Sequence, residues 1–259
     1  MKDLKNYLDE LVIKYETEDF IKKDPVQFPH RFRTQTDIEV SALISSCLAY
    51  GKREAFIEKL EFIHKIMGNS PADFCLNFDL LRDIHFFENF CYRFTSGTDI
   101  SLLINSLSLS LKEFTTIENM FMQNYKISDI CIKNALIHFV ERFYEYNVNN
   151  SYNKKGLCYL LPNPKSGSAC KRLNLFLKWM VRKAPVDLNI WKNVDPSKLL
   201  IPLDVHVARI SRKLEFTSRK SNDWLTAQEI TEKLRKFDAK DPVKYDFALF
   251  DIGIDKLLN

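Results

Sequence analysis

Lys171 and Asp204 are the two residues of this chain whose types and spacing best fit a single chemical site. Lys171 starts an apolar helical pattern, and Asp204 follows 33 residues later in Ile201-Pro202-Leu203-Asp204-Val205-His206-Val207. A neutral lysine amine is a nucleophile, and a carboxylate beside it can stabilise positive charge that develops on a substrate. The pair therefore predicts nucleophilic chemistry, although a solvated lysine and a helix-capping aspartate would look the same in sequence.

Basic residues gather around this lysine. Eight Lys or Arg residues and no Asp or Glu lie between Tyr146 and Val186, although the whole chain carries a formal charge of only +4. Such clustering favours a polyanion, and the tight connection at 160–171 would offer backbone N–H groups to a phosphate. An ordinary turn with surface lysines is the alternative. We expect contacts with DNA from Lys165, Ser166, Gly167, Ser168, Arg172, His206 and Arg209.

Helices must position these residues, because apolar residues recur with a period of 3.6 and the chain of 259 residues has only six glycines. The pattern predicts an all-α protein forming one helical domain, divided at most into two lobes. The terminal segments would form one lobe and residues 40–200, approximately, the other. A capping box is expected at Thr226 and Glu229. Helices are expected at 37–48, 53–67, 100–112, 127–146, 168–183, 205–214 and 226–237.

Composition narrows the class of protein. With 46% hydrophobic residues the chain can bury a large core, and it has no run of 18 apolar residues, so we expect a folded cytoplasmic protein with no membrane partner. The six cysteines are scattered and are expected to be reduced thiols. His206 has no second His or Cys at ligand spacing, so no metal site is predicted. We expect a monomer.

The segments around Lys171 and Asp204 resemble the helix-hairpin-helix DNA glycosylase superfamily, which includes endonuclease III and the 8-oxoguanine glycosylases. Leu203-Asp204-Val205-His206-Val207-Ala208-Arg209 is similar to that family's V-D-x-H-V-x-R motif. The family's hairpin is usually L-P-G-x-G-x-K, whereas this chain has Leu161-Pro162-Asn163-Pro164-Lys165-Ser166-Gly167, with Gly167 in place of the lyase lysine. The longer hairpin is more similar to the archaeal 8-oxoguanine branch, whose lysine lies in the following helix, and that points to Lys171. The whole chain also resembles an uncharacterised bacterial family distantly related to these enzymes.

The resemblance implies a helix-hairpin-helix fold with two helical lobes around a cleft. It implies a DNA glycosylase and abasic-site lyase in which Lys171 forms a Schiff base and Asp204 stabilises an oxocarbenium-like transition state. Duplex DNA with an oxidised purine or an abasic site would be the substrate. No cofactor is expected, because the four-cysteine iron–sulfur loop of many endonuclease III relatives has no counterpart after Cys170.

An enzyme of this class must hold a flipped base between apolar or aromatic groups. The candidates for that pocket are Tyr50, Phe28, Trp191 and Asp246, with Tyr50 in the suggestive sequence Tyr50-Gly51-Lys52-Arg53. The chain has 20 Phe and 10 Tyr, so core packing is the competing interpretation for the aromatics. For Asp246 the competing interpretation is the polar face of a terminal helix.

Two other functions are compatible with these patterns. A non-catalytic nucleic-acid-binding protein would keep the hairpin and the basic residues, and would bind with steep salt dependence. A structural or protein-interaction domain would use the helix after Lys171 for packing, through an apolar stripe made of Leu173, Phe176, Leu177, Met180 and Val181.

Overall fold

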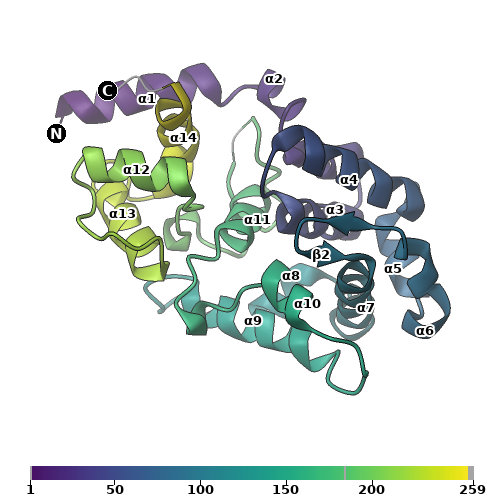
Figure 1. Cartoon of the computed structure of the whole chain (residues 1–259). Helices are drawn as coiled ribbons and strands as arrows, with labels where there is room; N and C mark the ends of the chain where they lie inside the picture. Colours follow the sequence, from purple (N-terminus) through teal and green to yellow (C-terminus); the bar gives the residue numbers. More distant parts are fainter. Residues whose placement is uncertain (1, 184, 256–259) are drawn as a thin grey trace. The chain divides into compact units, whose positions relative to one another are not determined.

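The chain folds mainly into helices, with one small antiparallel sheet of two strands in the described residues (Figure 1). The computed structural model describes residues 2–183 and 185–255. These elements confirm the all-α prediction. The chain divides into two compact units: unit 1 comprises residues 1–23, 127–132 and 164–259, and unit 2 comprises residues 24–126 and 133–163. Of the segment expected in one lobe, approximately 40–200, residues 127–132 and 164–200 belong to unit 1 and the others to unit 2.

Unit 1 contains the segments that carry Lys171 and Asp204. Its C-terminal helix packs extensively against two others, since α14 contacts both α12 and α1. The short η6 turn contacts α13 and leads directly into α14. The elements of unit 1 are α1 (Lys2–Tyr15), α2 (Glu18–Ile21), η4 (Pro164–Ser166), α11 (Lys171–Val181), η5 (Pro196–Lys198), α12 (Val205–Lys213), α13 (Trp224–Arg235), η6 (Pro242–Tyr245) and α14 (Asp246–Asp255).

Unit 2 is built around the long helix α7, which contacts α5, α8, α9 and α10. The strands pair Cys91 with Ser96 and Tyr92 with Thr95, immediately before α7 begins. The elements of unit 2 are η1 (Pro25–Gln27), η2 (Pro29–Arg31), α3 (Gln35–Leu48), α4 (Arg53–Met67), α5 (Pro71–Asn77), α6 (Leu80–Asp83), η3 (Ile84–Phe87), β1 (Cys91–Tyr92), β2 (Thr95–Ser96), α7 (Gly97–Phe114), α8 (Ile117–Met122), α9 (Lys133–Glu145) and α10 (Lys155–Leu160).

Two local predictions differ from the structure. The helix expected at 127–146 begins only at Lys133, because the segment before it is tied to η5: the Ile132 amide donates to the Lys198 carbonyl (3.2 Å) and the Lys198 amine to the Asp129 carbonyl (2.7 Å). The capping box expected at Thr226 is also wrong. Asp223 caps α13, and its carboxylate accepts a hydrogen bond from the Thr226 amide.

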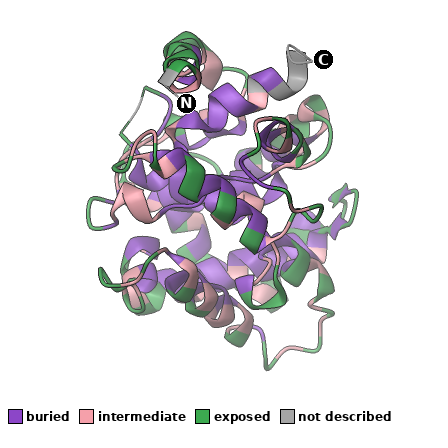
Figure 2. Cartoon of the chain, turned by 90° about the vertical axis from the view of Figure 1, so that its left-hand side faces the viewer, coloured by how far each residue is buried: buried purple, intermediate pink, exposed green. Residues whose placement is uncertain are grey.

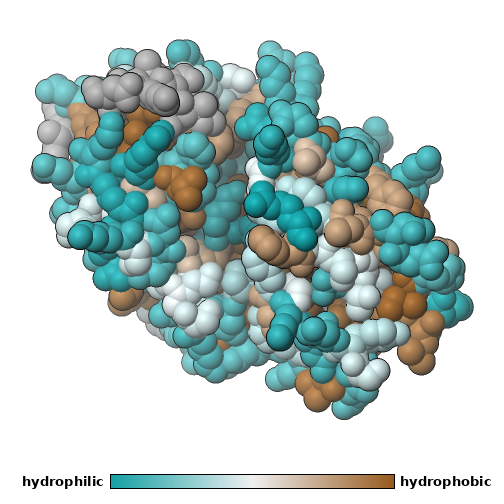
Figure 3. All heavy atoms as spheres, viewed as in Figure 1, coloured by the Kyte–Doolittle hydropathy of each residue, from teal (hydrophilic) through white to brown (hydrophobic). Residues whose placement is uncertain are grey.

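Burial follows the helical period that the sequence predicts. The apolar stripe of α11 is buried throughout, and Figure 2 shows helices whose buried and exposed residues lie on different sides. Hydrophilic residues cover most of the face seen in Figure 3, with apolar residues in small separate groups. All six cysteines are free thiols, and among the described helices none is long and apolar enough to cross a membrane.

Candidate active site around α11

Helix α11 carries a row of polar residues along an otherwise apolar sequence. Lys171, Asn174, Lys178 and Arg182 follow one another at helical spacing, so they lie on one face of the helix and its C-terminal end. Lys178 and Arg182 are buried, with 0% and 2% of their surface exposed. Two of the eight cations of the basic stretch therefore lie in the interior and not on a DNA-facing surface.

Lys178 is a fully buried cation with carboxylates on two sides. Its amine lies 3.3 Å from Asp187 Oδ1 and 3.8 Å from Asp246 Oδ2, and 3.8 Å from the centre of the Phe247 ring. A buried ammonium is costly unless it is paired, and these contacts supply the pairing. Lys178 thus links α11 to the start of α14.

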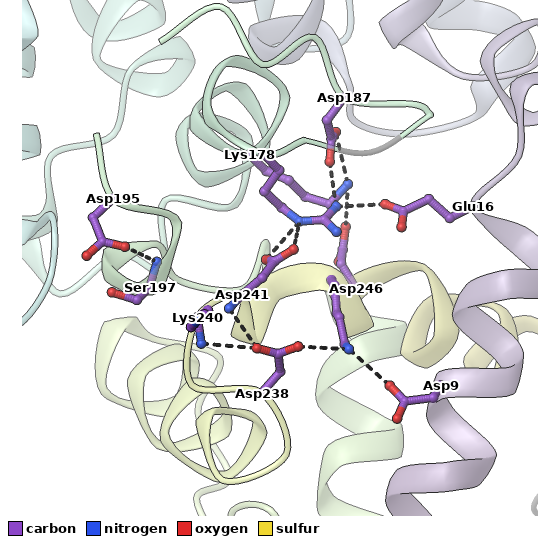
Figure 4. Close-up of polar contacts among 12 residues, drawn as sticks. Asp9, Glu16, Lys178, Asp187, Asp195, Ser197, Asp238, Lys240, Asp241 and Asp246 are labelled. Carbon is purple, nitrogen blue, oxygen red and sulfur yellow. Dashed lines mark hydrogen bonds and ion pairs between the residues drawn. The ribbon is translucent and has the colours of Figure 1, made fainter. Parts of the chain in front are cut away.

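Arg182 forms a second buried ion-pair group, next to the first. Its Nη1 donates to Glu16 Oε1 at 2.7 Å and also to Asp187, and its Nε lies 2.9 Å from both oxygens of Asp241. Figure 4 labels Glu16, Asp187 and Asp241, the carboxylates from different segments of the chain that contact this guanidinium. The contacts connect α11 with the residue after α1 and the residue before η6, and so fix the direction in which α11 presents its face.

Asp246 connects these buried cations to the two residues predicted to do chemistry. Burial raises the pKa of the Asp246 carboxyl to about 7, and Lys178 opposes that rise. The charge of Asp204 raises the pKa further and that of Lys171 lowers it. Asp204 caps α12, and α12 packs against α14, which begins at Asp246. Lys171 lies two turns before Lys178 on α11, and Lys178 contacts Asp246, so the three residues lie on neighbouring elements of unit 1.

Asp204 is the N-cap of α12. Its Oδ1 accepts hydrogen bonds from the backbone amides of His206 and Val207, both at 2.8 Å. These two bonds fix the carboxylate at the helix end, and Oδ2 accepts no hydrogen bond from any described residue. Asp204 is only partly buried, so the capping role leaves one carboxylate oxygen for a ligand.

The turn before α11 is exposed, and hydrogen bonds connect it to the start of α13. Lys165, Ser166 and Gly167 are exposed, and Gly167 adopts a positive φ of 80° that favours glycine. The Gly167 carbonyl accepts a hydrogen bond from the Trp224 amide at 2.9 Å, and Ser168 forms an isolated β-bridge with Asp223. This anchoring to the start of α13 makes the turn a defined surface of unit 1.

The other predicted DNA contacts lie on α11 and α12. Arg172 is partly buried next to Lys171, and Arg209 is exposed on α12. His206 is partly buried, and its ring packs edge to face on Phe250 of α14 with 5.7 Å between centroids. Their roles in DNA binding stay predictions.

The aromatic candidates for a base pocket divide between the two units. Phe28 in unit 2 is fully buried and stacks on His64 at 4.5 Å; Trp191 in unit 1 is fully buried and packs edge to face on Phe176 at 5.3 Å. Both rings have the surroundings of core residues, without the open face that a flipped base needs. Tyr50 is partly exposed in unit 2.

Residues 24–255 match the model of a family described as a protein of unknown function, DUF2400. The chain belongs to this family. No curated protein and no solved structure matches it.

The sequence of this DUF2400 chain does not by itself predict the buried group formed by Glu16, Lys178, Arg182 and Asp187. The polar residues of α11 follow one another at intervals of three, four and four residues, and this spacing could have predicted such a group. A lysine and an arginine among the apolar residues of a helix need buried carboxylates as partners. The partners lie in connections far apart in sequence. In residues 2–183 and 185–255 no group of three or more His, Cys, Asp or Glu side chains is placed to hold a metal ion.

Proposed function

We propose that this protein is a DNA glycosylase and abasic-site lyase that works through a Schiff base on Lys171, with an oxidised purine as the damaged base. The proposal includes the helix-hairpin-helix glycosylase-like fold with two helical lobes that the sequence resemblance implies. The observation that carries it is the placement of Lys171, Asp204 and Asp246 on the neighbouring elements α11, α12 and α14 of unit 1. The sequence motif selected the first two residues independently of that geometry.

The chemistry would begin with attack of the neutral Lys171 amine on C1′ of the damaged nucleotide. The C1′–N bond to the base breaks, and the base leaves with the bonding electrons and takes up a proton. The amine then loses a proton, and its lone pair forms a C=N bond as C1′–O4′ breaks; O4′ keeps the bonding electrons and takes up a proton, which leaves an iminium ion. Removal of a C2′ proton breaks the C3′–O3′ bond and cuts the strand.

Each charged residue would have a separate task in this sequence of steps. Asp204, fixed by two backbone amides, would stabilise the positive charge that develops on the sugar through its open Oδ2. Asp246 has a pKa of about 7, so near neutral pH it exchanges protons readily. It would take the proton of the Lys171 amine or supply one to the leaving base. Lys178 holds Asp246 in position.

Asp204→Asn tests the role of the charge without loss of the cap, because asparagine is as good an N-cap as aspartate. We expect excision of 8-oxoguanine from a duplex oligonucleotide to slow by about 100-fold or more, with a change in unfolding free energy below about 0.5 kcal/mol. Single-turnover strand cleavage measures the first quantity and urea unfolding the second.

A matched control is Asp195→Asn, which changes another capping aspartate of unit 1, at the start of η5. It should leave both quantities unchanged. Full activity in Asp204→Asn would remove Asp204 from the reaction. Absence of excision and of strand cleavage in the unaltered protein, with DNA binding retained, would leave a non-catalytic nucleic-acid-binding protein.

A further inference from the structure

An exposed aromatic and basic surface lies on unit 2, where the two strands meet. The turn between β1 and β2 consists of Arg93 and Phe94, and Arg93 adopts a left-handed backbone with φ of 52°. Phe94 is 68% exposed, an unusual position for a phenylalanine. We define the hairpin-tip surface as Lys52, Arg53, Arg93, Phe94 and Tyr159.

The aromatic residues of this surface are held in place by contacts with one another and with Tyr50. The rings of Phe94 and Tyr159 meet edge to face with centroids 5.6 Å apart, and Tyr159 meets Tyr50 in the same way at 5.4 Å. The Tyr50 hydroxyl donates to the Tyr92 carbonyl at 3.0 Å and lies 2.8 Å from Thr95 Oγ1. Three rings are thus ordered before any ligand arrives, which lowers the entropy lost on binding.

The cation Arg93 lies beside the rings, and Lys52 and Arg53 follow Gly51 in the chain. The Arg93 guanidinium lies over Gly51 so closely that a Cβ added to this glycine would be 2.6 Å from Arg93 Nη1. It also lies 5.9 Å from the centre of the Phe94 ring. Lys52 is exposed and follows Gly51 directly. Within the part of the chain that the structure describes, Lys52, Arg53 and Arg93 form no ion pair with a carboxylate, so their charge is available to an anionic partner.

We propose that the hairpin-tip surface binds an unstacked base of a DNA strand, with Phe94 stacked on the base and the three cations beside the neighbouring phosphates. Rings that stack on bases, combined with a positively charged groove, are the general means of binding single strands. Leu81 of unit 2 is even more exposed, at 80%, but it lacks this combination, because it has no ring and the neighbouring Arg82 is paired with Asp83. The inference rests on the proposed function in that both take DNA as the partner.

Binding of a fluorescent single-stranded oligonucleotide, followed by anisotropy, tests this surface. Phe94→Ala should weaken binding by between about 5-fold and 100-fold, the usual effect of losing one base–aromatic stack. Phe94→Trp should retain the affinity, and its added emission should be quenched by DNA relative to the unaltered protein. Arg93→Gln should weaken binding and reduce the dependence of log Kd on log salt concentration by about 0.7, the single-strand value for one phosphate.

Leu81→Ala is the matched control, because it also truncates a strongly exposed apolar residue of unit 2, and it should bind DNA normally. The inference is overturned if Phe94→Ala binds as tightly as Leu81→Ala, or if DNA leaves the emission of Phe94→Trp unchanged.

The same proteins separate this inference from the proposed function. Borohydride trapping on an abasic duplex reports Lys171 chemistry, whereas anisotropy on an intact single strand reports the hairpin tip. If an adduct is trapped but the affinity for the single strand does not depend on Phe94, only the proposal for the hairpin-tip surface is rejected. If the affinity depends on Phe94 but no adduct is trapped, that proposal is retained and the lyase activity is rejected.

Discussion

At the scale of single residues, the buried charges of α11 differ from the exposed ones in what they contribute. Lys178 has no exposed surface, and its amine is compensated by Asp187 and Asp246. Lys171, seven residues earlier on the same face, is partly exposed. The first lysine is thus suited to hold carboxylates in place and the second to meet a substrate.

Lys178→Met should destabilise the protein by about 3–5 kcal/mol at pH 8, because it removes the cation beside the buried Asp246 carboxyl and leaves Asp187 paired with Arg182 alone. The loss should shrink at pH 5, where Asp246 is protonated in the folded protein. Urea unfolding at both pH values measures this. The control is Lys183→Met, which removes an exposed lysine just after α11 and should cost less than about 0.5 kcal/mol. Equal stability of the two variants would show that the Lys178 charge is not needed.

The roles of single residues could be predicted from the sequence where a local sequence pattern indicates them. Asp204 was predicted as a possible cap from Pro202-Leu203-Asp204, and the structure confirms the cap. Asp246 was interpreted chiefly as one polar residue on a terminal helix, and its pKa near 7 was not foreseen. That pKa depends on burial and on charges more than 40 residues away, which no local pattern encodes.

At the scale of elements, the period of the apolar residues predicted the approximate positions of the helices well and their first residues less well. Residues 53–67 were predicted as a helix, and α4 has those bounds. The start of α9 was wrong because hydrogen bonds to Lys198 withdraw residues 127–132 from the helix. The capping box was predicted at α13 but occurs at α7, where Ser96 and Asp99 bond each other's backbone amides. Gly97, the first residue of α7, packs closely against Phe87, and the helical period does not predict this contact.

Gly97→Ala should destabilise unit 2 by about 3 kcal/mol, because the added Cβ would lie 1.7 Å from the Phe87 carbonyl oxygen and the backbone would have to move. The measurement is the free energy of unfolding in urea. Thr98→Ala, one residue further along α7, is the control and should change it by less than about 1 kcal/mol. A Gly97→Ala variant as stable as the control would contradict the close approach of η3 to the start of α7.

At the scale of the whole molecule, two buried groups give the stability opposite pH dependences. Burial lowers the pKa of His64 in unit 2 to about 4 from an ordinary value of 6.5. Between these values the unfolded chain binds the extra proton, so stability falls as pH falls from about 6.5 to 4. Asp246 has its pKa raised from 3.8 to about 7, so its contribution is complete below pH 3.8 and is lost as pH rises to about 7.

Replacing His64 should therefore remove the acid-dependent part. In Ser41→Ala/His64→Phe both partners of the 2.8 Å Ser41–His64 hydrogen bond become apolar, and the ring stacked on Phe28 is kept. Between pH 7 and pH 4 the unaltered protein should lose about 3 kcal/mol more of its unfolding free energy than this variant. Urea unfolding across that range provides the comparison. Parallel curves would show that His64 is protonated equally in the folded and unfolded states.

The central claim concerns the whole chain acting on its substrate, and borohydride trapping on a duplex with an abasic site tests it most directly. The account predicts a covalent protein–DNA adduct that disappears in Lys171→Ala and persists in Lys183→Ala, which removes an exposed lysine just after α11. An adduct that survives Lys171→Ala, or no adduct with the unaltered protein while DNA is bound, would contradict the assignment of Lys171 as the nucleophile.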